Sequence, residues 1–210
     1  MDDGRLQTKR EGAYHHGSLR AALIDSAKAV LADRGVTGFS LRETARRAGV
    51  TAAAPKHHFA DTRALLTALA TEAFSGLADA LEAADADCAT QADCLMAQGE
   101  AYVAFALENR ALFGLMWQAE LLDFGDADLM AQKERSFDAL DRRVRGPDAP
   151  AVPQDSPAMA ATFACWSVVH GFAHMAIEGN FGLDWKVAKA TARKLLPASL
   201  ALLVRPNFSG

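Results

Sequence analysis

The sequence predicts an all-α fold, with a small N-terminal helical domain followed by a larger C-terminal helical domain. Half of the 210 residues are hydrophobic, which is enough to bury a large core. Alanine is abundant while Val, Ile and Thr are sparse, a composition that favours helices over strands. Apolar residues recur at helical spacing along most of the chain, whereas no segment is convincing as a strand.

The first expected helix follows a polar N-terminal stretch. Residues 1–16 are polar and basic without apolar periodicity, which indicates a flexible arm. Ser18 is expected to cap a helix whose apolar residues run at helical spacing from Leu19 to Leu31. Gly35 is expected to end this helix in the left-handed conformation.

Two short helices are expected next. Ser40 and Glu43 have the spacing of a capping box, and Gly49 is expected to end the helix that they begin. Thr51 is expected to cap a third helix, over residues 52–58. Pro55 would be its fourth residue and would remove one hydrogen bond without breaking the helix.

The remaining chain predicts further helices and one linker. Asp61 is expected to cap a long helix, and four prolines and a glycine over residues 146–157 exclude a helix there. Pro197 is expected to kink or break the last helix. The expected helices span residues 62–83, 91–108, 110–118, 126–145, 158–178 and 184–204.

Charge is distributed unevenly along the chain. Residues 1–63 hold eleven Lys and Arg against seven Asp and Glu, whereas the rest holds eleven against nineteen. A basic end on an acidic body suggests that one end of the protein meets a polyanion. The chain is expected to have no long uncharged apolar run and therefore no membrane span. No secretory signal is expected either. The three cysteines are interpreted as reduced thiols of a cytoplasmic protein.

The segment around residues 40–59 follows the plan of a helix-turn-helix, in which a glycine turn joins two short helices. The second helix would enter the major groove of DNA. Its alanines allow close approach to base edges, and its polar residues supply hydrogen bonds and charge. A plain surface helix with a solvated basic end is the alternative. The expected phosphate contacts are Arg42, Thr51, Lys56 and His58, and the expected base contacts are Ala52, Ala53 and His57.

The N-terminal arm carries a further candidate contact. Arg5, Lys9 and Arg10 would reach a minor groove or the DNA backbone. The alternative is a disordered arm without a role in binding.

These motifs together resemble the TetR family of transcriptional regulators. The matching stretch runs from Tyr14 to Leu66 and includes "SLRETARRAGV" and the following "TAAAPKHHF". The segment "CWSVVHGFAHMAIEG" in the C-terminal half resembles the W-H-G signature of one ligand-domain subgroup of that family. One departure is Lys56, which stands where the family usually has a tyrosine.

The resemblance implies a homodimer that binds a palindromic operator and releases it when a small, largely apolar or aromatic effector binds. It implies an arm over residues 1–16, a DNA-binding domain over 17–62, and a ligand-binding and dimerisation domain over 63–210. Neither an enzymatic activity, a cofactor, a metal nor a membrane partner is expected. The expected ligand-binding residues are Tyr102, Phe105, Trp117, Trp166 and His170.

The sequence is also compatible with two alternative functions. His170, His174 and Glu178 lie on one helix face, and two such histidines are able to bind zinc in a metal-assisted enzyme. The C-terminal half is alternatively a dimerisation domain without any ligand. Metal analysis and ligand-dependent melting would separate these alternatives from a ligand-responsive repressor.

Overall fold

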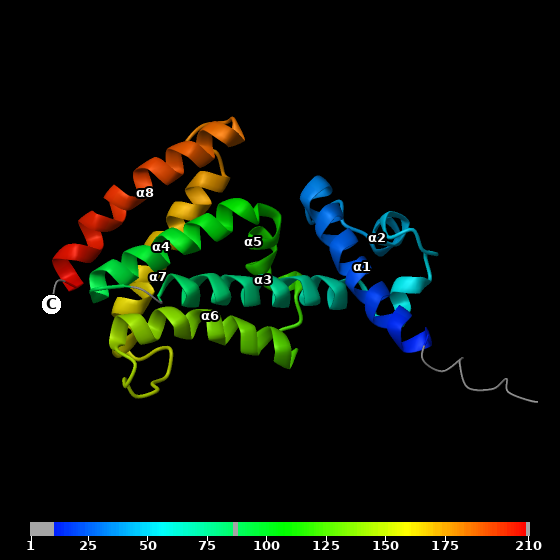
Figure 1. Cartoon of the computed structure of the whole chain (residues 1–210), viewed down its shortest axis with the longest axis horizontal. Coiled ribbons are helices and arrows are strands. Elements are labelled where there is room, and N and C mark those ends of the chain that lie inside the picture. Colours follow the sequence, from blue (N-terminus) through cyan, green and yellow to red (C-terminus); the bar gives the residue numbers. More distant parts are fainter. Residues whose placement is uncertain (1–10, 86–87, 209–210) are drawn as a thin grey trace, which may run out of the picture.

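The computed structural model describes residues 11–85 and 88–208. Within these two ranges the chain consists of helices and connecting turns, without a strand, which confirms the all-α prediction. Figure 1 shows a small N-terminal group of helices at one end and a larger bundle at the other. The long helices are α1 (Glu11–Arg34), α3 (Thr62–Ala84), α4 (Gln91–Glu108), α6 (Ala127–Arg145), α7 (Ala160–Ile177) and α8 (Trp185–Phe208).

Helix α1 begins earlier than the sequence analysis expects. It starts at Glu11, so the expected cap at Ser18 is wrong, and residues 11–16 are helical rather than part of an arm. The remainder of the expected arm, with Arg5, Lys9 and Arg10, lies outside the described residues. The C-terminal end agrees with the prediction, since Gly35 follows Arg34 with a left-handed φ of 65°.

The N-terminal domain packs α1 against α2 (Leu41–Arg47) and the start of α3. The Ser40 side chain accepts a hydrogen bond from the Glu43 amide at 3.2 Å, which confirms one half of the capping box. Ala45 is 1% exposed. Gly49 takes the turn after α2 with a φ of 71°, a conformation that glycine adopts without strain.

Helix α3 joins the two parts of the molecule. It begins where Asp61 accepts a hydrogen bond from the Ala64 amide at 2.8 Å, as predicted for an N-cap. Leu65 and Leu69 pack in the same continuous core as Leu23 and Leu31 of α1. Further along, α3 runs into the C-terminal bundle, where it packs mainly against α6 and α4 (Figure 1).

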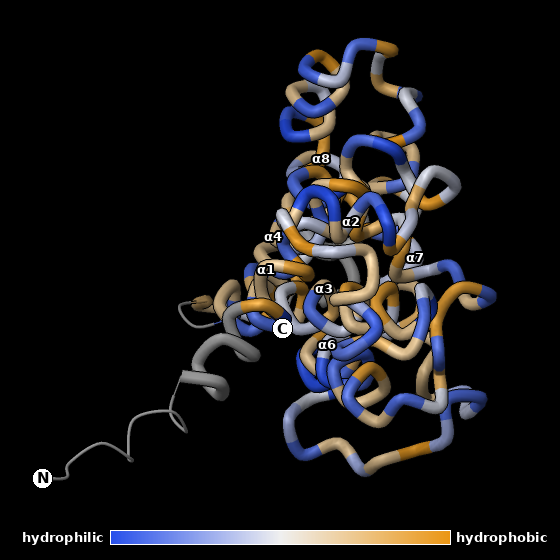
Figure 2. The backbone as a smooth tube through the Cα atoms, turned by 90° about the vertical axis from the view of Figure 1, so that its right-hand side faces the viewer, coloured by the Kyte–Doolittle hydropathy of each residue, from blue (hydrophilic) through white to orange (hydrophobic). Residues whose placement is uncertain are grey.

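The C-terminal bundle places α4 at its centre, in contact with α3, α7 and α8. A short helix, α5 (Arg110–Met116), follows α4 and turns the chain back toward α3 and α1. Figure 2 views the molecule from the side of the N-terminal domain and shows that α2 contains hydrophilic residues. The 3-10 helix η3 (Pro157–Met159) leads into α7.

Helix α8 continues through Pro197 without a break, so the prediction of a break there is wrong. Pro197 is exposed, whereas Leu196 and Leu200 are buried against the bundle. The carbonyl that loses its partner at this proline therefore lies on the side of the helix near solvent, where the loss costs less.

Two helical segments among the described residues are long and apolar enough to cross a membrane by length and composition: Thr62–Ala84 and Pro157–Ile177. The expectation that no such run exists is therefore wrong. Core helices of soluble proteins meet the same criterion, and 56% of the α3 window is buried inside the protein. The window in Pro157–Ile177 is only 28% buried, so α7 leaves apolar surface uncovered.

Candidate DNA-binding surface and ligand cavity

The segment expected to read DNA is shorter than a regular α-helix. Its helical part is the 3-10 helix η1 (Ala54–His57), in place of the expected helix over residues 52–58. The Thr51 carbonyl accepts a hydrogen bond from the Ala54 amide at 3.0 Å, but η1 has no side-chain cap, so the expected capping role of Thr51 is wrong. Pro55 lacks an amide hydrogen and favours the first turn of a helix, which explains the short element.

Two buried residues anchor this segment while its other face stays open. Pro55 and Phe59 are buried, and the Phe59 amide donates to the Pro55 carbonyl at 2.9 Å. The guanidinium of Arg20 lies 5.3 Å from the centre of the Phe59 ring, which ties the segment to α1. The opposite face is therefore free to meet a partner without unfolding of the segment.

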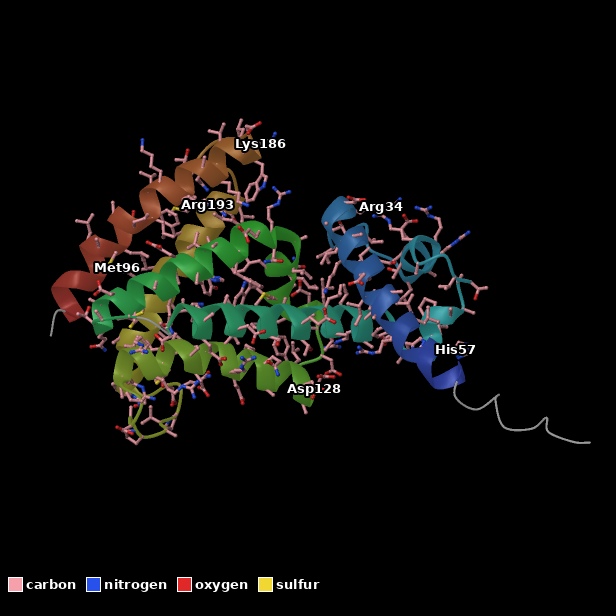
Figure 3. The ribbon with its side chains drawn as sticks, in the orientation of Figure 1. Arg34, His57, Met96, Asp128, Lys186 and Arg193 are labelled. Carbon is pink, nitrogen blue, oxygen red and sulfur yellow. The ribbon has the colours of Figure 1, made fainter. Side chains whose placement is uncertain are left out.

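Most of the predicted DNA contacts lie on that open face. His58 is half-buried, so the two histidines differ, and His57 is the one that faces solvent. Figure 3 shows His57 at the outer end of the N-terminal domain, remote from Lys186 and Arg193 on α8. The exposed residues of the predicted set are Arg42, Thr51, Ala52, Ala53, Lys56 and His57.

Helix α2 is fixed by a network of charged groups around Glu43. The Glu43 carboxylate accepts hydrogen bonds from Arg46 at 2.8 Å and from Arg47 at 3.1 Å, and it lies 3.2 Å from Arg34. The hydrogen bonds from Arg46 and Arg47 lower the pKa of Glu43 to about 2. Glu43 thus serves the packing of α2 on α1 rather than the second half of a capping box.

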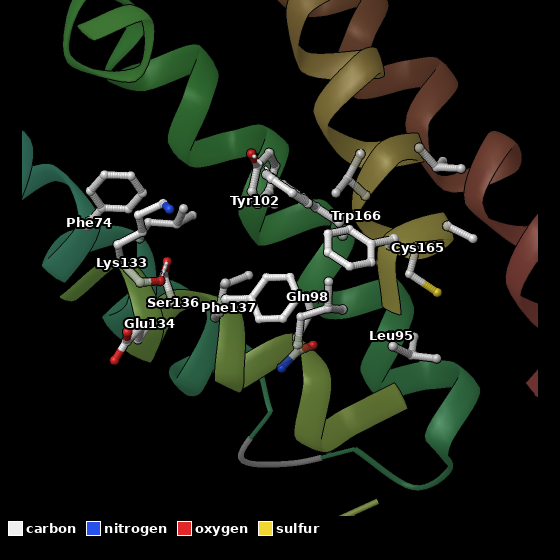
Figure 4. A pocket seen from close by; sticks show the side chains of 18 of the residues that line it. Phe74, Leu95, Gln98, Tyr102, Lys133, Glu134, Ser136, Phe137, Cys165 and Trp166 are labelled. Atoms are coloured by element: carbon white, nitrogen blue, oxygen red, sulfur yellow. Dashed lines mark hydrogen bonds between the residues drawn. The ribbon is translucent and has the colours of Figure 1, made fainter. Parts of the chain in front are cut away.

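A cavity of about 680 Å³ lies inside the C-terminal bundle. Its wall is largely apolar and comes from α3, α4, α6, α7 and α8. Figure 4 shows Phe74, Tyr102, Phe137 and Trp166 around this space. The lining includes Phe74, Leu77, Leu81, Leu95, Gln98, Tyr102, Trp117, Lys133, Glu134, Ser136, Phe137, Phe163 and Trp166.

Three of the five expected ligand-binding residues line this cavity: Tyr102, Trp117 and Trp166. Phe105 does not, because one turn beyond Tyr102 its ring packs over Gly76 of α3. His170 is also absent from the wall and acts on it through Tyr102. For these two residues, the expectation of a place in the wall is wrong.

Tyr102 links the cavity wall to His170. Its hydroxyl oxygen lies 2.7 Å from His170 Nδ1 and accepts a hydrogen bond from Trp166 Nε1 at 3.3 Å. Burial raises the pKa of Tyr102, and burial followed by repulsion from His174 lowers the pKa of His170 to about 4. At neutral pH His170 is therefore uncharged, and its Nδ1 accepts a hydrogen bond from the Tyr102 hydroxyl, which orients the tyrosine ring in the wall.

The two histidines of α7 belong to an aromatic cluster. The rings of His170 and His174 lie 4.5 Å apart, and Phe113 packs against both. Trp117 lies 4.7 Å from the His170 ring. These ring contacts favour a packing role, and the described residues whose ligand atoms cluster closely enough to hold a metal ion do not include His170 or His174.

Helix α6 contributes a part of the wall that the sequence analysis missed. Lys133, Glu134, Ser136 and Phe137 line the cavity from this helix. Gln98 of α4 lies among them and donates a hydrogen bond to the Ala139 carbonyl at 3.2 Å. These residues are mostly polar and lie in a polar helix, so no apolar or aromatic stripe in the sequence pointed to them.

Comparison with known proteins finds a matching family model for each of the two regions. Residues 23–69 match the family described as "Bacterial regulatory proteins, tetR family", and residues 95–198 match the "Tetracyclin repressor-like, C-terminal domain". A search of curated proteins finds no match.

Solved structures with the same fold include proteins from several bacteria. A protein with unknown function from Rhodococcus sp. RHA1 is 34% identical, with a TM-score of 0.67 over 88% of this chain and 97% of that one. The TetR family regulator PfmR from Thermus thermophilus is 22% identical, with a TM-score of 0.65 over 87% and 97%.

FadR from Bacillus subtilis, solved in complex with stearoyl-CoA, is 17% identical, with a TM-score of 0.61 over 88% of this chain and 97% of that one. At these identities PfmR and FadR show the fold, while the matched family descriptions cover both the DNA-binding segment and the C-terminal bundle. The chain belongs to the TetR family of transcriptional regulators.

Proposed function

We propose that the protein is a homodimeric repressor that binds a palindromic operator and releases it when a small, largely apolar effector enters the cavity. One observation carries this proposal: α3 is shared by the two regions. It begins at Thr62, shortly after the DNA-reading segment (residues 51–57), and Phe74, Leu77 and Leu81 of the same helix line the cavity. A ligand that displaces these side chains acts on the element that holds the DNA-reading segment.

The DNA side of the proposal rests on the exposed face of residues 51–57. The methyl groups of Ala52 and Ala53 allow close approach to base edges, and Lys56 and His57 supply hydrogen bonds and charge. Arg42 lies exposed at the start of α2, where it reaches the phosphate backbone.

The dimer rests on the apolar surface of α7 and α8. Large hydrophobic side chains at their outer faces would be covered in a symmetric interface between two copies. Such an interface would place the two DNA-reading segments about 34 Å apart, the spacing of successive major grooves. The exposed hydrophobic residues on or between these helices are Met175 (44%), Leu183 (99%), Val187 (55%), Leu195 (43%) and Leu202 (77%).

The residues in the wall of the cavity indicate the chemical nature of the effector. Six aromatic side chains are in this largely apolar wall and favour a flat or long apolar molecule. The indole N–H of Trp117 is buried without a hydrogen-bond partner among the described residues, so an effector with a carbonyl or hydroxyl oxygen gains a bond there. FadR, a protein of the same fold, was solved in complex with stearoyl-CoA, a ligand with a long apolar acyl chain.

The path from cavity to DNA runs through the segment after α5. Trp117 lines the cavity, and the residues that follow it are tied to the start of α3: Arg63 donates to the Leu122 carbonyl at 2.5 Å, and the Asp123 amide donates to Thr67 Oγ1 at 3.0 Å. An effector that shifts Trp117 thereby changes the position of α3. It favours a dimer in which the distance between the two DNA-reading segments is altered. This function places the protein in the cytoplasm, beside the chromosome, and gives it no enzymatic step.

Selection of genomic DNA fragments by the purified full-length protein tests this function. We expect enrichment of a palindromic sequence with half-sites about one helical turn apart, bound by two chains and released more easily as salt rises. Enrichment of no sequence above random fragments, with a folded protein, would contradict the proposal.

A further inference from the structure

A cluster of metal-ligating side chains lies at the turn between α3 and α4. In the part of the chain that the structure describes, the ligand atoms of Asp85, Cys88 and Cys94 all lie within 4.8 Å of one another. Asp85 follows the last residue of α3, and Cys94 lies in the first turns of α4. The cluster is therefore at the far end of α3 from the DNA-reading segment.

Among the described residues, only one of the two carboxylate oxygens of Asp85 has a polar partner. Asp85 Oδ2 pairs with the guanidinium of Arg143, whereas Asp85 Oδ1 is buried and has no hydrogen-bond partner within residues 11–85 and 88–208. A buried carboxylate oxygen without a partner is costly, and a bound cation would remove that cost.

A small polar chamber adjoins the cluster. It has a volume of about 190 Å³ and includes Asp85, Gln98 and Arg143 in its wall. Gln98 Oε1 and Arg143 Nε are both buried and have no hydrogen-bond partner in the described part of the chain. A polar chamber of this size has room for water, which would satisfy these atoms.

We propose that Asp85, Cys88 and Cys94 bind a thiol-preferring divalent cation of the zinc type, with a water molecule from the chamber as the fourth ligand. Two sulfurs and one carboxylate oxygen form a ligand set that suits tetrahedral Zn²⁺. Metal–sulfur bonds of about 2.3 Å require the three side chains to close in only slightly from their present separation.

The charges of this site balance. Each thiol gives its proton to solvent when it coordinates the metal, so two protons leave for each cation bound. The resulting two thiolates and one carboxylate carry three negative charges, and the dication together with Arg143 carries three positive ones. No oxidant or reductant takes part.

The site borders the cavity without belonging to it. Leu81 precedes Asp85 by about one turn of α3, and Leu95 follows Cys94 directly; both leucines line the cavity. A bound cation would therefore fix the ends of α3 and α4 that form this part of the cavity wall. The proposal stands independently of the regulatory function, because metal binding is measured without DNA or effector.

Titration of the full-length protein with Cd²⁺ tests the site. The protein is treated with a chelator and kept reduced with a phosphine, and the sulfur-to-cadmium charge-transfer absorption is followed. We expect one Cd²⁺ per chain with the intensity of two thiolates, and Zn²⁺ should compete for it. Cys88→Ser and Cys94→Ser should each weaken binding about 100-fold or more, and Asp85→Asn about tenfold.

Cys165→Ser is the matched control, since Cys165 lies outside the cluster and should leave binding unchanged. Cys88 is only half-buried and Asp85 is a helix cap, so their variants keep the fold, which helix content by circular dichroism checks. Absence of the absorption, or its persistence in the Cys88→Ser/Cys94→Ser double variant, would overturn the proposal. So would a Cys88–Cys94 disulfide that forms in air while the reduced protein binds no Cd²⁺.

Discussion

The two recognition regions of this protein are built in opposite ways. The DNA-reading face comes from one short stretch, Thr51 to His57, whose side chains are mostly exposed and whose anchors, Pro55 and Phe59, are neighbours in sequence. The cavity is enclosed by residues from five long helices that are far apart in the chain. The first region is therefore set by local sequence and the second by packing between helices.

Because of this difference, substitutions in the two regions should affect different properties: binding in the first and stability in the second. A side chain on the DNA-reading face contacts little of its own protein, so its loss should change binding without changing stability. A side chain around the cavity holds several helices together, so its loss should change stability first. Paired substitutions, one in each region, therefore test the distinction.

Phe113→Ala should give the largest effect. Phe113 is fully buried and packs against Tyr102, Trp117 and both histidines of α7. We expect the free energy of unfolding, measured with urea, to fall by about 3–5 kcal/mol. His57→Ala is the control from the other region and should change it by less than about 0.5 kcal/mol. Similar losses in both variants would contradict the distinction.

Ser136→Phe should fill the cavity without removing an essential contact. Ser136 lines the wall, and among the described residues its hydroxyl bonds only to the Lys133 carbonyl of its own helix. A compound that raises the melting temperature of the wild type should bind this variant about 100-fold more weakly, because the ring occupies its space. Ala131→Phe, at an exposed position of α6, should bind the compound like the wild type.

Lys56→Ala should weaken operator binding roughly tenfold and reduce the slope of the salt dependence by about one. The lysine is exposed beside His57 and has the charge to contact a phosphate. Lys186→Ala removes the same charge from the start of α8, away from His57, and should leave the slope unchanged (Figure 3). Equal effects of the two variants would show that bulk charge, not this face, binds DNA.

His170 should give the smallest effect, as a dependence of stability on pH. Its pKa of about 4 lies below the ordinary value of 6.5 because of burial. Between pH 6.5 and pH 4, His170 is therefore protonated in the unfolded chain but not in the folded chain. The free energy of unfolding falls as the pH drops through this range. Between pH 7 and pH 5 the wild type should lose about 1 kcal/mol more than His170→Asn, a figure reduced for the partial exposure of the ring. Parallel pH curves for the two proteins would contradict this cause.

Much of the N-terminal region was predictable because its signals are local. Ser40, Asp61 and Gly35 each specify a helix end through a bond or a φ angle within a few residues. The 3-10 form of residues 54–57 was not predictable, because it depends on how Pro55 packs into the core. The early start of α1 was missed for a different reason, because the polar stretch at its start has no apolar periodicity.

The cavity was predictable only in part. Aromatic residues of α4 and α7 pointed to it, and Tyr102 and Trp166 do line it. Whether Phe105 faced the cavity depended on the approach of Gly76 from α3, which no local pattern reports. The proximity of Cys88 and Cys94 likewise depends on how the turn between α3 and α4 folds.

We propose above all that occupancy of the cavity controls the DNA-reading face through α3. Operator affinity measured with and without a saturating, melting-temperature-raising compound tests it most directly, in the wild type and in Ser136→Phe. We expect the compound to weaken operator binding of the wild type at least about tenfold and to leave Ser136→Phe unaffected. A compound that saturates the wild-type cavity and leaves operator affinity unchanged would contradict the claim.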